Sequence, residues 1–100
     1  MPNIFEYFGL IFYFYSNEHT PIHVHVKKGG KEIVFEIIMK NDQLHEVKKR
    51  NVKGKEPLTS KEIAEAEKFV ITYHKNIIKK WVNYFVLGKA VNFTKIKTKL

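Results

Sequence analysis

The sequence contains no cysteine, and only one of its 18 basic residues, Arg50, is an arginine. Without cysteine the chain can form neither a disulfide framework nor a thiolate zinc site, and a cysteine nucleophile is excluded. A chain of this kind is expected in the reducing cytoplasm. The scarcity of arginine argues against base-specific DNA readout, which relies on bidentate arginine contacts in the major groove.

The sequence also lacks an apolar run long enough to cross a membrane, which takes ~20 residues. The most apolar stretch, residues 4–15, carries Glu6 and has no basic segment in front of it, unlike an export signal. We therefore expect strand structure at this end of the chain and no association with a membrane.

What the sequence does contain is enough apolar material for one folded core. The 100 residues are 44% hydrophobic and include eight phenylalanines, which predicts a single domain over residues 1–100. The formal net charge is +8. Such a surplus attracts phosphate backbones or acidic protein partners, although a lysine-rich genome would produce the same balance without any function.

Strand patterns fill the first half of the chain and helix patterns fill the second, which predicts an α+β fold. Strands are expected at residues 4–8, 10–15, 23–28, 31–39 and 43–47, and residues 90–100 could add a final edge strand. We expect a small antiparallel sheet of three to five strands, packed by one long C-terminal amphipathic helix or by two helices.

A hairpin is predicted at Gly29 and Gly30, because glycine accepts the positive φ that two-residue turns require. The turn fixes a register that pairs Lys28 with Lys31 and places His23 opposite Glu36. Side chains then alternate between two faces. The apolar face consists of Ile22, Val24, Val26, Ile33, Phe35 and Ile37. The other face carries His23, His25, Lys27, Glu32, Val34 and Glu36.

A long helix is expected after Pro57. Thr59 and Glu62 have the spacing of a capping box, and apolar residues then recur at three- and four-residue steps along one helical face. These residues are Ile63, Ala66, Val70, Tyr73, Ile77, Trp81 and Phe85. Gly88 is expected to cap the C-terminus, and the helix is either continuous over residues 60–87 or broken near residues 74–76.

Three of the five histidines, His19, His23 and His25, lie within seven positions. Because strand residues two apart point the same way, the Cα atoms of His23 and His25 should lie about 6.5–7 Å apart. Two such imidazoles could share a divalent metal such as zinc, with Glu36 across the ladder as a further ligand. His19 or Glu18 could complete the set and leave one position open for catalysis.

Two other interpretations of the cluster stay open. His19 or His23 could act as a general acid or base beside Lys27 in a small metal-free nuclease, with His19, His23 and Glu36 as candidate catalytic residues. Alternatively, the histidines belong to a polar surface that binds a partner or only supports the sheet, since His23 with Glu36 makes an ordinary cross-strand pair.

The run KKRNVKGK, residues 48–55, is a second candidate binding segment. Its cations could contact a nucleic-acid backbone or the acidic patch of a protein, and a solvated loop is the competing interpretation. The predicted binding residues are therefore His19, His23, His25, Lys27, Lys48, Lys49, Arg50 and Lys53.

The stretch NEHTPIHVHV, residues 17–26, resembles the signature of a family of small bacterial proteins known as domain of unknown function 4160. The correspondence falls on Glu18, His19, Pro21, His23, His25, Trp81, Gly88, Lys89 and Ile96. The family commonly has two prolines before the first strand histidine, where this chain has Pro21 and Ile22. Residues 43–55 are the least similar section.

The activity of that family is unassigned, so the resemblance implies no chemistry. Its genes tend to lie beside another small protein, of the domain-of-unknown-function family 2442, in pairs that look like toxin–antitoxin modules. The resemblance implies a small cytoplasmic interaction protein, one half of such a module, that binds a small partner protein encoded nearby, or RNA or DNA. A nuclease that uses the histidine cluster is the alternative, and a homodimer formed through a sheet edge or the helix is a third hypothesis.

Overall fold

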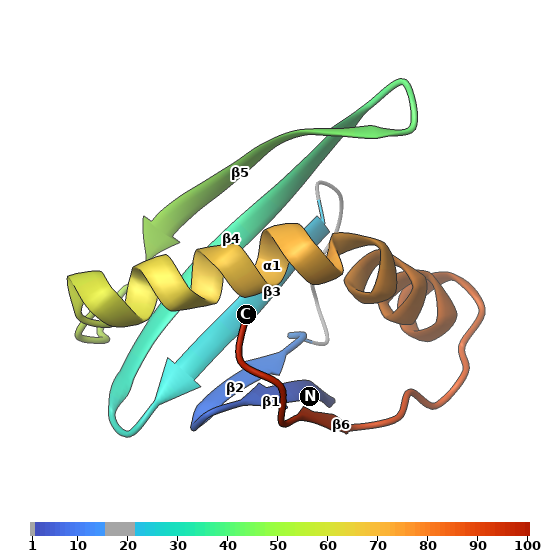
Figure 1. The fold of residues 1–100 in the computed structure, drawn as a ribbon. Helices are drawn as coiled ribbons and strands as arrows, with labels where there is room; N and C mark the ends of the chain where they lie inside the picture. The colour runs from blue at the N-terminus through green and yellow to red at the C-terminus, as the bar shows by residue number, and fades with distance from the viewer. Residues whose placement is uncertain (1, 16–21) are drawn as a thin grey trace.

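The computed structural model describes residues 2–15 and 22–100. These residues form one sheet of six strands in the order β5-β4-β3-β2-β1-β6, with a long helix packed on one face (Figure 1). The elements are β1 (Asn3–Tyr7), β2 (Leu10–Tyr13), β3 (Ile22–Lys28), β4 (Lys31–Lys40), β5 (Gln43–Asn51), α1 (Ser60–Trp81), the π-helical turn η1 (Val82–Val86) and β6 (Thr94–Ile96). The α+β prediction is confirmed.

The expected number of strands, three to five, is too small, and the expectation of a purely antiparallel sheet is wrong. Strands β1 to β5 pair antiparallel, whereas β6 pairs parallel with β1. The pattern of the C-terminal tail indicated an edge strand. It carried no information on direction, because alternation is the same in parallel and antiparallel edge strands.

The predicted hairpin between β3 and β4 is confirmed in its register. Lys28 pairs with Lys31 and His23 with Glu36, and the turn residue Gly29 has a φ of 63°. The apolar side chains of this hairpin face the helix and join the hydrophobic core. Turn chemistry and alternation therefore specify this part of the sheet together.

Strand β5 is longer than predicted. The expected strand covered residues 43–47, but pairing with β4 continues as far as Asn51, opposite Ile33. Lys48, Lys49 and Arg50 are therefore strand residues, and the loop interpretation is wrong for them. The hydrophobic pattern missed them because all three are exposed, so no alternation marks the strand.

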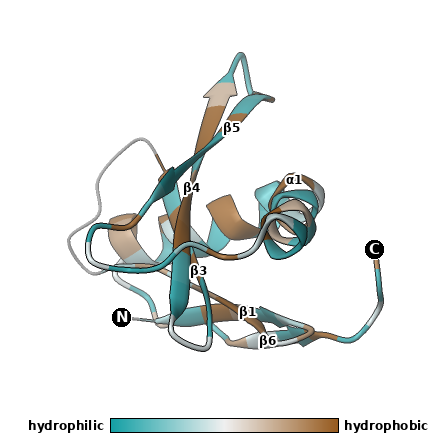
Figure 2. Ribbon diagram, turned by 90° about the vertical axis from the view of Figure 1, so that its left-hand side faces the viewer, coloured by the Kyte–Doolittle hydropathy of each residue, from teal (hydrophilic) through white to brown (hydrophobic). Residues whose placement is uncertain are grey.

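The core lies between α1 and the concave side of the sheet. Figure 2 shows β3 and β4 beside the helix, β1 and β6 below it and β5 above it. Phe69 of α1 occupies the centre of an aromatic cluster, with ring centroids 4.5 Å from Phe12 and 4.6 Å from Tyr73. Phe5 and Tyr7 contact the same ring, at 5.5 and 5.0 Å. These aromatic contacts fasten the helix to β1 and β2.

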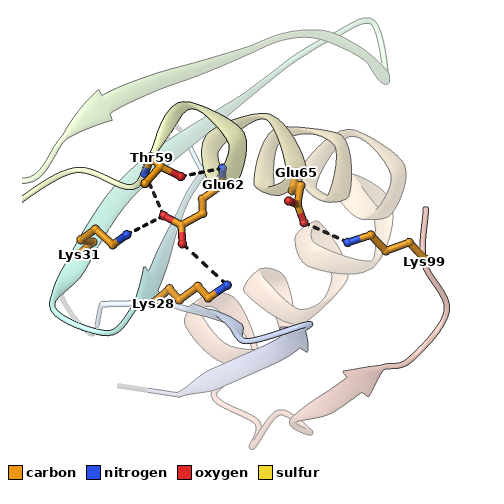
Figure 3. Close-up of polar contacts among 6 residues, drawn as sticks. All are labelled: Lys28, Lys31, Thr59, Glu62, Glu65 and Lys99. Atoms are coloured by element: carbon orange, nitrogen blue, oxygen red, sulfur yellow. Dashed lines mark hydrogen bonds and ion pairs between the residues drawn. The ribbon is translucent and has the colours of Figure 1, made fainter.

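The start of α1 is fixed by the predicted capping box (Figure 3). The Glu62 N–H donates to the Thr59 hydroxyl oxygen (3.2 Å), and the Thr59 N–H donates to the Glu62 carboxylate (2.9 Å). Lys31 donates to the same carboxylate at 2.9 Å, and Lys28 lies 3.7 Å from it. The Thr59 backbone hydrogen bond and then Lys31 lower the pKa of Glu62 from 4.5 to about 2. This carboxylate therefore ties the helix to the β3–β4 hairpin.

The end of the helix is irregular. Tyr73 has non-helical angles (φ −106°, ψ 17°), so the kink lies one residue before the predicted break. Gly88 follows the helical segment with a φ of 65°, as expected of a C-terminal cap. Within the described ranges, no helix is long and apolar enough to span a bilayer.

Candidate functional site

The sheet face turned away from α1, here called the outer face, carries most of the predicted site residues. Directly opposite residues share a face, and the register places Tyr13 beside His25, Glu36 beside Lys48 and Val34 beside Arg50. The outer face is therefore formed by Tyr13, His23, His25, Lys27, Glu32, Val34, Glu36, Lys48 and Arg50. The predicted sharing of one face by His23, His25, Lys27 and Glu36 is confirmed.

A buried polar network occupies the middle of the outer face. The Tyr13 hydroxyl donates to Glu32 Oε2 (2.5 Å), and His25 Nδ1 lies 3.2 Å from the same oxygen. Tyr13, His25 and Glu32 are only 3%, 4% and 5% exposed. Burial, followed by the hydrogen bond to Glu32, raises the pKa of Tyr13, so this phenol stays protonated and remains a donor. Lys27 Nζ lies 4.7 Å from the centre of the Tyr13 ring.

His23 belongs to a second pair. Its Nε2 atom lies 3.1 Å from Glu36 Oε2, and this pair is partly buried. The two histidines of β3 thus contact two different carboxylates, His23 that of Glu36 and His25 that of Glu32. The second contact is diagonal across the ladder, since Glu32 lies directly opposite Lys27. Sequence reasoning placed Glu32 on this face but did not identify it as the partner of His25.

The predicted metal ligands are His23, His25 and Glu36. Across residues 2–15 and 22–100, no group of three or more histidine, aspartate or glutamate side chains is arranged to hold a metal ion. His19, Glu18 and Pro21 lie outside the described residues. The described part of the cluster therefore forms two separate histidine–carboxylate pairs.

The cations of β5 divide between the two faces of the sheet. Lys48 and Arg50 lie on the outer face and are exposed, and neither forms an ion pair with any part of the chain that the structure describes. Lys49 points to the helix side, where its Nζ donates to Glu67 at 3.2 Å. Lys53 is exposed in the turn that follows β5. The structure thus brings together Lys48 and Arg50, but not Lys49 or Lys53, with the histidine face.

A shallow groove runs between β5 and the first turns of α1. It has a volume of about 270 Å³ and is lined by Lys49, Ser60, Ile63, Ala64 and Glu67. Sequence reasoning missed it, because it arises from the position of the helix beside the sheet edge. The one groove residue that the sequence pattern had singled out is Ile63, as a member of the predicted apolar face.

Of the comparisons with known proteins, the one with family models found a match. No curated protein and no solved structure matches the chain. The family model described as a domain of unknown function (DUF4160) matches residues 9–82, which extend from the β1–β2 turn through α1. Because this match covers most of the chain, the protein belongs to the DUF4160 family.

Proposed function

We propose that this protein is a cytoplasmic binding protein, one half of a toxin–antitoxin-like module, and that it binds its partner through a basic surface centred on β5. The observation that carries the proposal is the state of this strand: Lys48 and Arg50 are exposed and form no ion pair within the described residues. Exposed cations with no ion pair among the described residues are available to contact a polyanion or an acidic protein.

The histidine face has a supporting role in this proposal. His25 is 4% exposed and His23 9%, and both contact carboxylates of β4. A general acid or base must reach the atom that it protonates or deprotonates. The burial of these rings favours a role in fixing β3 against β4, so that the adjacent β5 edge is held in one position.

The proposal is tested by co-expression with the small protein encoded next to this chain, followed by gel filtration with light scattering. We expect a stable complex that contains both chains, and we expect Lys48→Glu with Arg50→Glu to weaken it by at least about tenfold. The matched control is Lys89→Glu with Lys97→Glu, which makes the same change in net charge away from β5. Loss of the complex in the control but not in the β5 variant would refute the assignment of the surface.

The same preparation tests the nuclease alternative. Purified protein is incubated with RNA and DNA, with and without divalent ions, beside His23→Ala. The binding proposal predicts no cleavage. Cleavage that the His23→Ala variant loses would replace the proposal with a nuclease that uses this cluster, and cleavage that survives would remove His23 from the candidate catalytic residues.

A further inference from the structure

Strand β5 is an open edge of the sheet. It is an end strand, with β4 on one side and no strand on the other within the described chain. It contains nine residues, and seven of these are exposed. The outward N–H and C=O groups of an edge strand are available to a further strand.

The charge on β5 selects what can pair with it. In an antiparallel pairing of two copies centred on Lys49, Lys48 would lie opposite Arg50 of the second copy, and Lys49 opposite Lys49. Like charges directly opposite one another are destabilising in a sheet. The charges that oppose self-pairing attract a strand that carries carboxylates at the facing positions, so charge complementarity indicates an acidic partner and argues against a homodimer through this edge.

The two sides of β5 require different side chains. Carboxylates on the outer side of an added strand would face Lys48 and Arg50. On the other side, the added strand would pass the groove of about 270 Å³, whose lining includes Ile63 and Ala64. Because side chains alternate between faces, every second residue would meet this groove, which favours apolar side chains there.

Resting on the proposed function, we infer that the β5 edge binds an extended segment of a partner protein in which acidic residues alternate with apolar ones. The segment adds a seventh strand to the sheet. Its backbone hydrogen-bonds to β5, its carboxylates face Lys48 and Arg50, and its apolar side chains enter the groove beside α1.

A single-stranded nucleic acid fits this edge less well. Binding of single strands without sequence preference combines cations with aromatic side chains that stack on the bases. Among the described phenylalanine, tyrosine and tryptophan side chains, the exposed ones are Phe8 (47%) and Phe93 (50%), in the β1–β2 turn and just before β6. Both lie toward the opposite edge of the sheet from β5.

The inference is tested with fluorescent synthetic peptides whose length matches the nine residues of β5. In the test peptide glutamate alternates with valine; a block peptide has the same composition with the glutamates at one end. We expect anisotropy titrations to show binding of the alternating peptide at least about tenfold tighter than that of the block peptide. N-methylation of alternate residues along one edge of the test peptide should abolish binding, because it removes backbone donors.

Two variants of the chain locate the peptide. Lys48→Glu with Arg50→Glu should weaken binding of the alternating peptide by about tenfold or more, whereas Lys89→Glu with Lys97→Glu should leave it unchanged. Ala64→Gln fills the groove while it keeps good helix propensity, and it should weaken peptide binding by about fivefold without changing binding of a single-stranded RNA of equal charge. Circular dichroism of each variant confirms that it folds.

Equal binding of the alternating and block peptides, or tighter binding of the RNA, would overturn the inference and indicate a general polyanion surface. Formation of a β5-dependent homodimer would overturn it as well. The proposed function is tested separately by the complex with the neighbouring protein. If that complex forms through β5 but the alternating peptide does not bind, the inference is wrong and the proposed function stands. If the complex does not form through β5, the proposed function falls.

Discussion

The two edge strands of the sheet, β5 and β6, differ in length and in the contacts that hold them. At one edge, β5 has nine residues and is largely exposed. At the other edge, β6 has three residues and lies parallel to β1. The exposed residues of the first edge include Lys48 and Arg50, which form no ion pair among the described residues, whereas the second edge is held by side chains from the helix and from the core. Exposed edges that persist in a folded protein invite pairing, so the comparison identifies β5 as the edge where a partner strand fits.

Lys80 of α1 holds β6 in place at the second edge. Its Nζ atom donates to the Ile4 carbonyl oxygen (2.8 Å) in β1, to the Asn92 carbonyl oxygen (2.7 Å) and to the Thr94 hydroxyl (3.0 Å) in β6. The same ammonium lies 3.9 Å from the centre of the Phe5 ring. Burial lowers the pKa of Lys80. One cation from α1 therefore fastens β6 to β1, whereas Lys48 and Arg50 of β5 are exposed and form no ion pair among the described residues.

The largest expected effect comes from the aromatic cluster beneath β1 and β2. Phe69→Ala should lower the free energy of unfolding by about 3–5 kcal/mol, because it removes a fully buried ring that contacts Phe5, Tyr7 and Phe12. Urea denaturation measures the loss. Ile71→Ala, on an exposed position of the same helix, is the matched control and should change stability by less than about 0.5 kcal/mol. Equal losses of unfolding free energy in the Phe69→Ala and Ile71→Ala variants would show that the aromatic cluster does not anchor the helix to β1 and β2.

The next largest effect is expected at Lys80. Lys80→Met should lower the free energy of unfolding by about 2–3 kcal/mol, because carbonyl groups that it binds lose a charged donor. It should also open the C-terminal segment, so that limited trypsin cleavage at Lys95 and Lys97 becomes faster. Lys79→Met, at the exposed neighbouring position, should leave both measurements unchanged. Unchanged trypsin cleavage at Lys95 and Lys97 in the Lys80→Met variant would contradict the role of Lys80 in holding β6 against β1.

A smaller effect is expected at the helix start. Glu62→Gln should lower the free energy of unfolding by about 1 kcal/mol, through the loss of charge at the capping box and at Lys31. Since the folded pKa of Glu62 is lowered to about 2, its stabilisation is present above pH 4.5 and is lost as the pH falls toward about 2. The stability difference between wild type and variant should shrink over that range. Glu65→Gln, which breaks only the exposed pair with Lys99 (Figure 3), should show a smaller change at every pH.

The smallest effect on stability is expected at the open edge. Lys48→Glu with Arg50→Glu should lower the free energy of unfolding by less than about 1 kcal/mol, because neither side chain forms an ion pair in the described chain and the only new repulsion between directly opposite residues is that of position 48 with Glu36. The same variant should bind the alternating peptide about tenfold more weakly or worse, so it separates a contribution to binding from a contribution to stability. A loss of several kcal/mol would indicate that these cations support the fold, and it would remove the contrast with β6.

Local signals predicted the elements best. The register of the β3–β4 hairpin follows from Gly29 and Gly30 and from strict alternation, and the start of α1 follows from Thr59 and Glu62. Each of these features depends on residues close in sequence. The periodic apolar face of the helix also depends on residues close in sequence, and the kink at Tyr73 lies one residue from the expected position.

The features that sequence reasoning missed depend on distant contacts. Strand β6 runs parallel to β1, a strand from the other end of the chain. Lys80 donates to the carbonyl oxygen of Ile4, 76 positions away. Tyr13 donates to Glu32 and lies beside His25 because β2 pairs with β3. The second half of β5, residues 48–51, was missed because its cations lie on both faces, so the alternation that marks a half-buried strand is absent there.

Of the two edge strands, we expect β5 and not β6 to receive a partner. Amide chemical-shift mapping of the ¹⁵N-labelled protein with the alternating acidic–apolar peptide distinguishes the two strands. The largest shifts should fall on residues 46–51 and on the first turns of α1, with residues 94–96 unchanged. Shifts centred on β1 and β6, with β5 unaffected, would contradict this expectation.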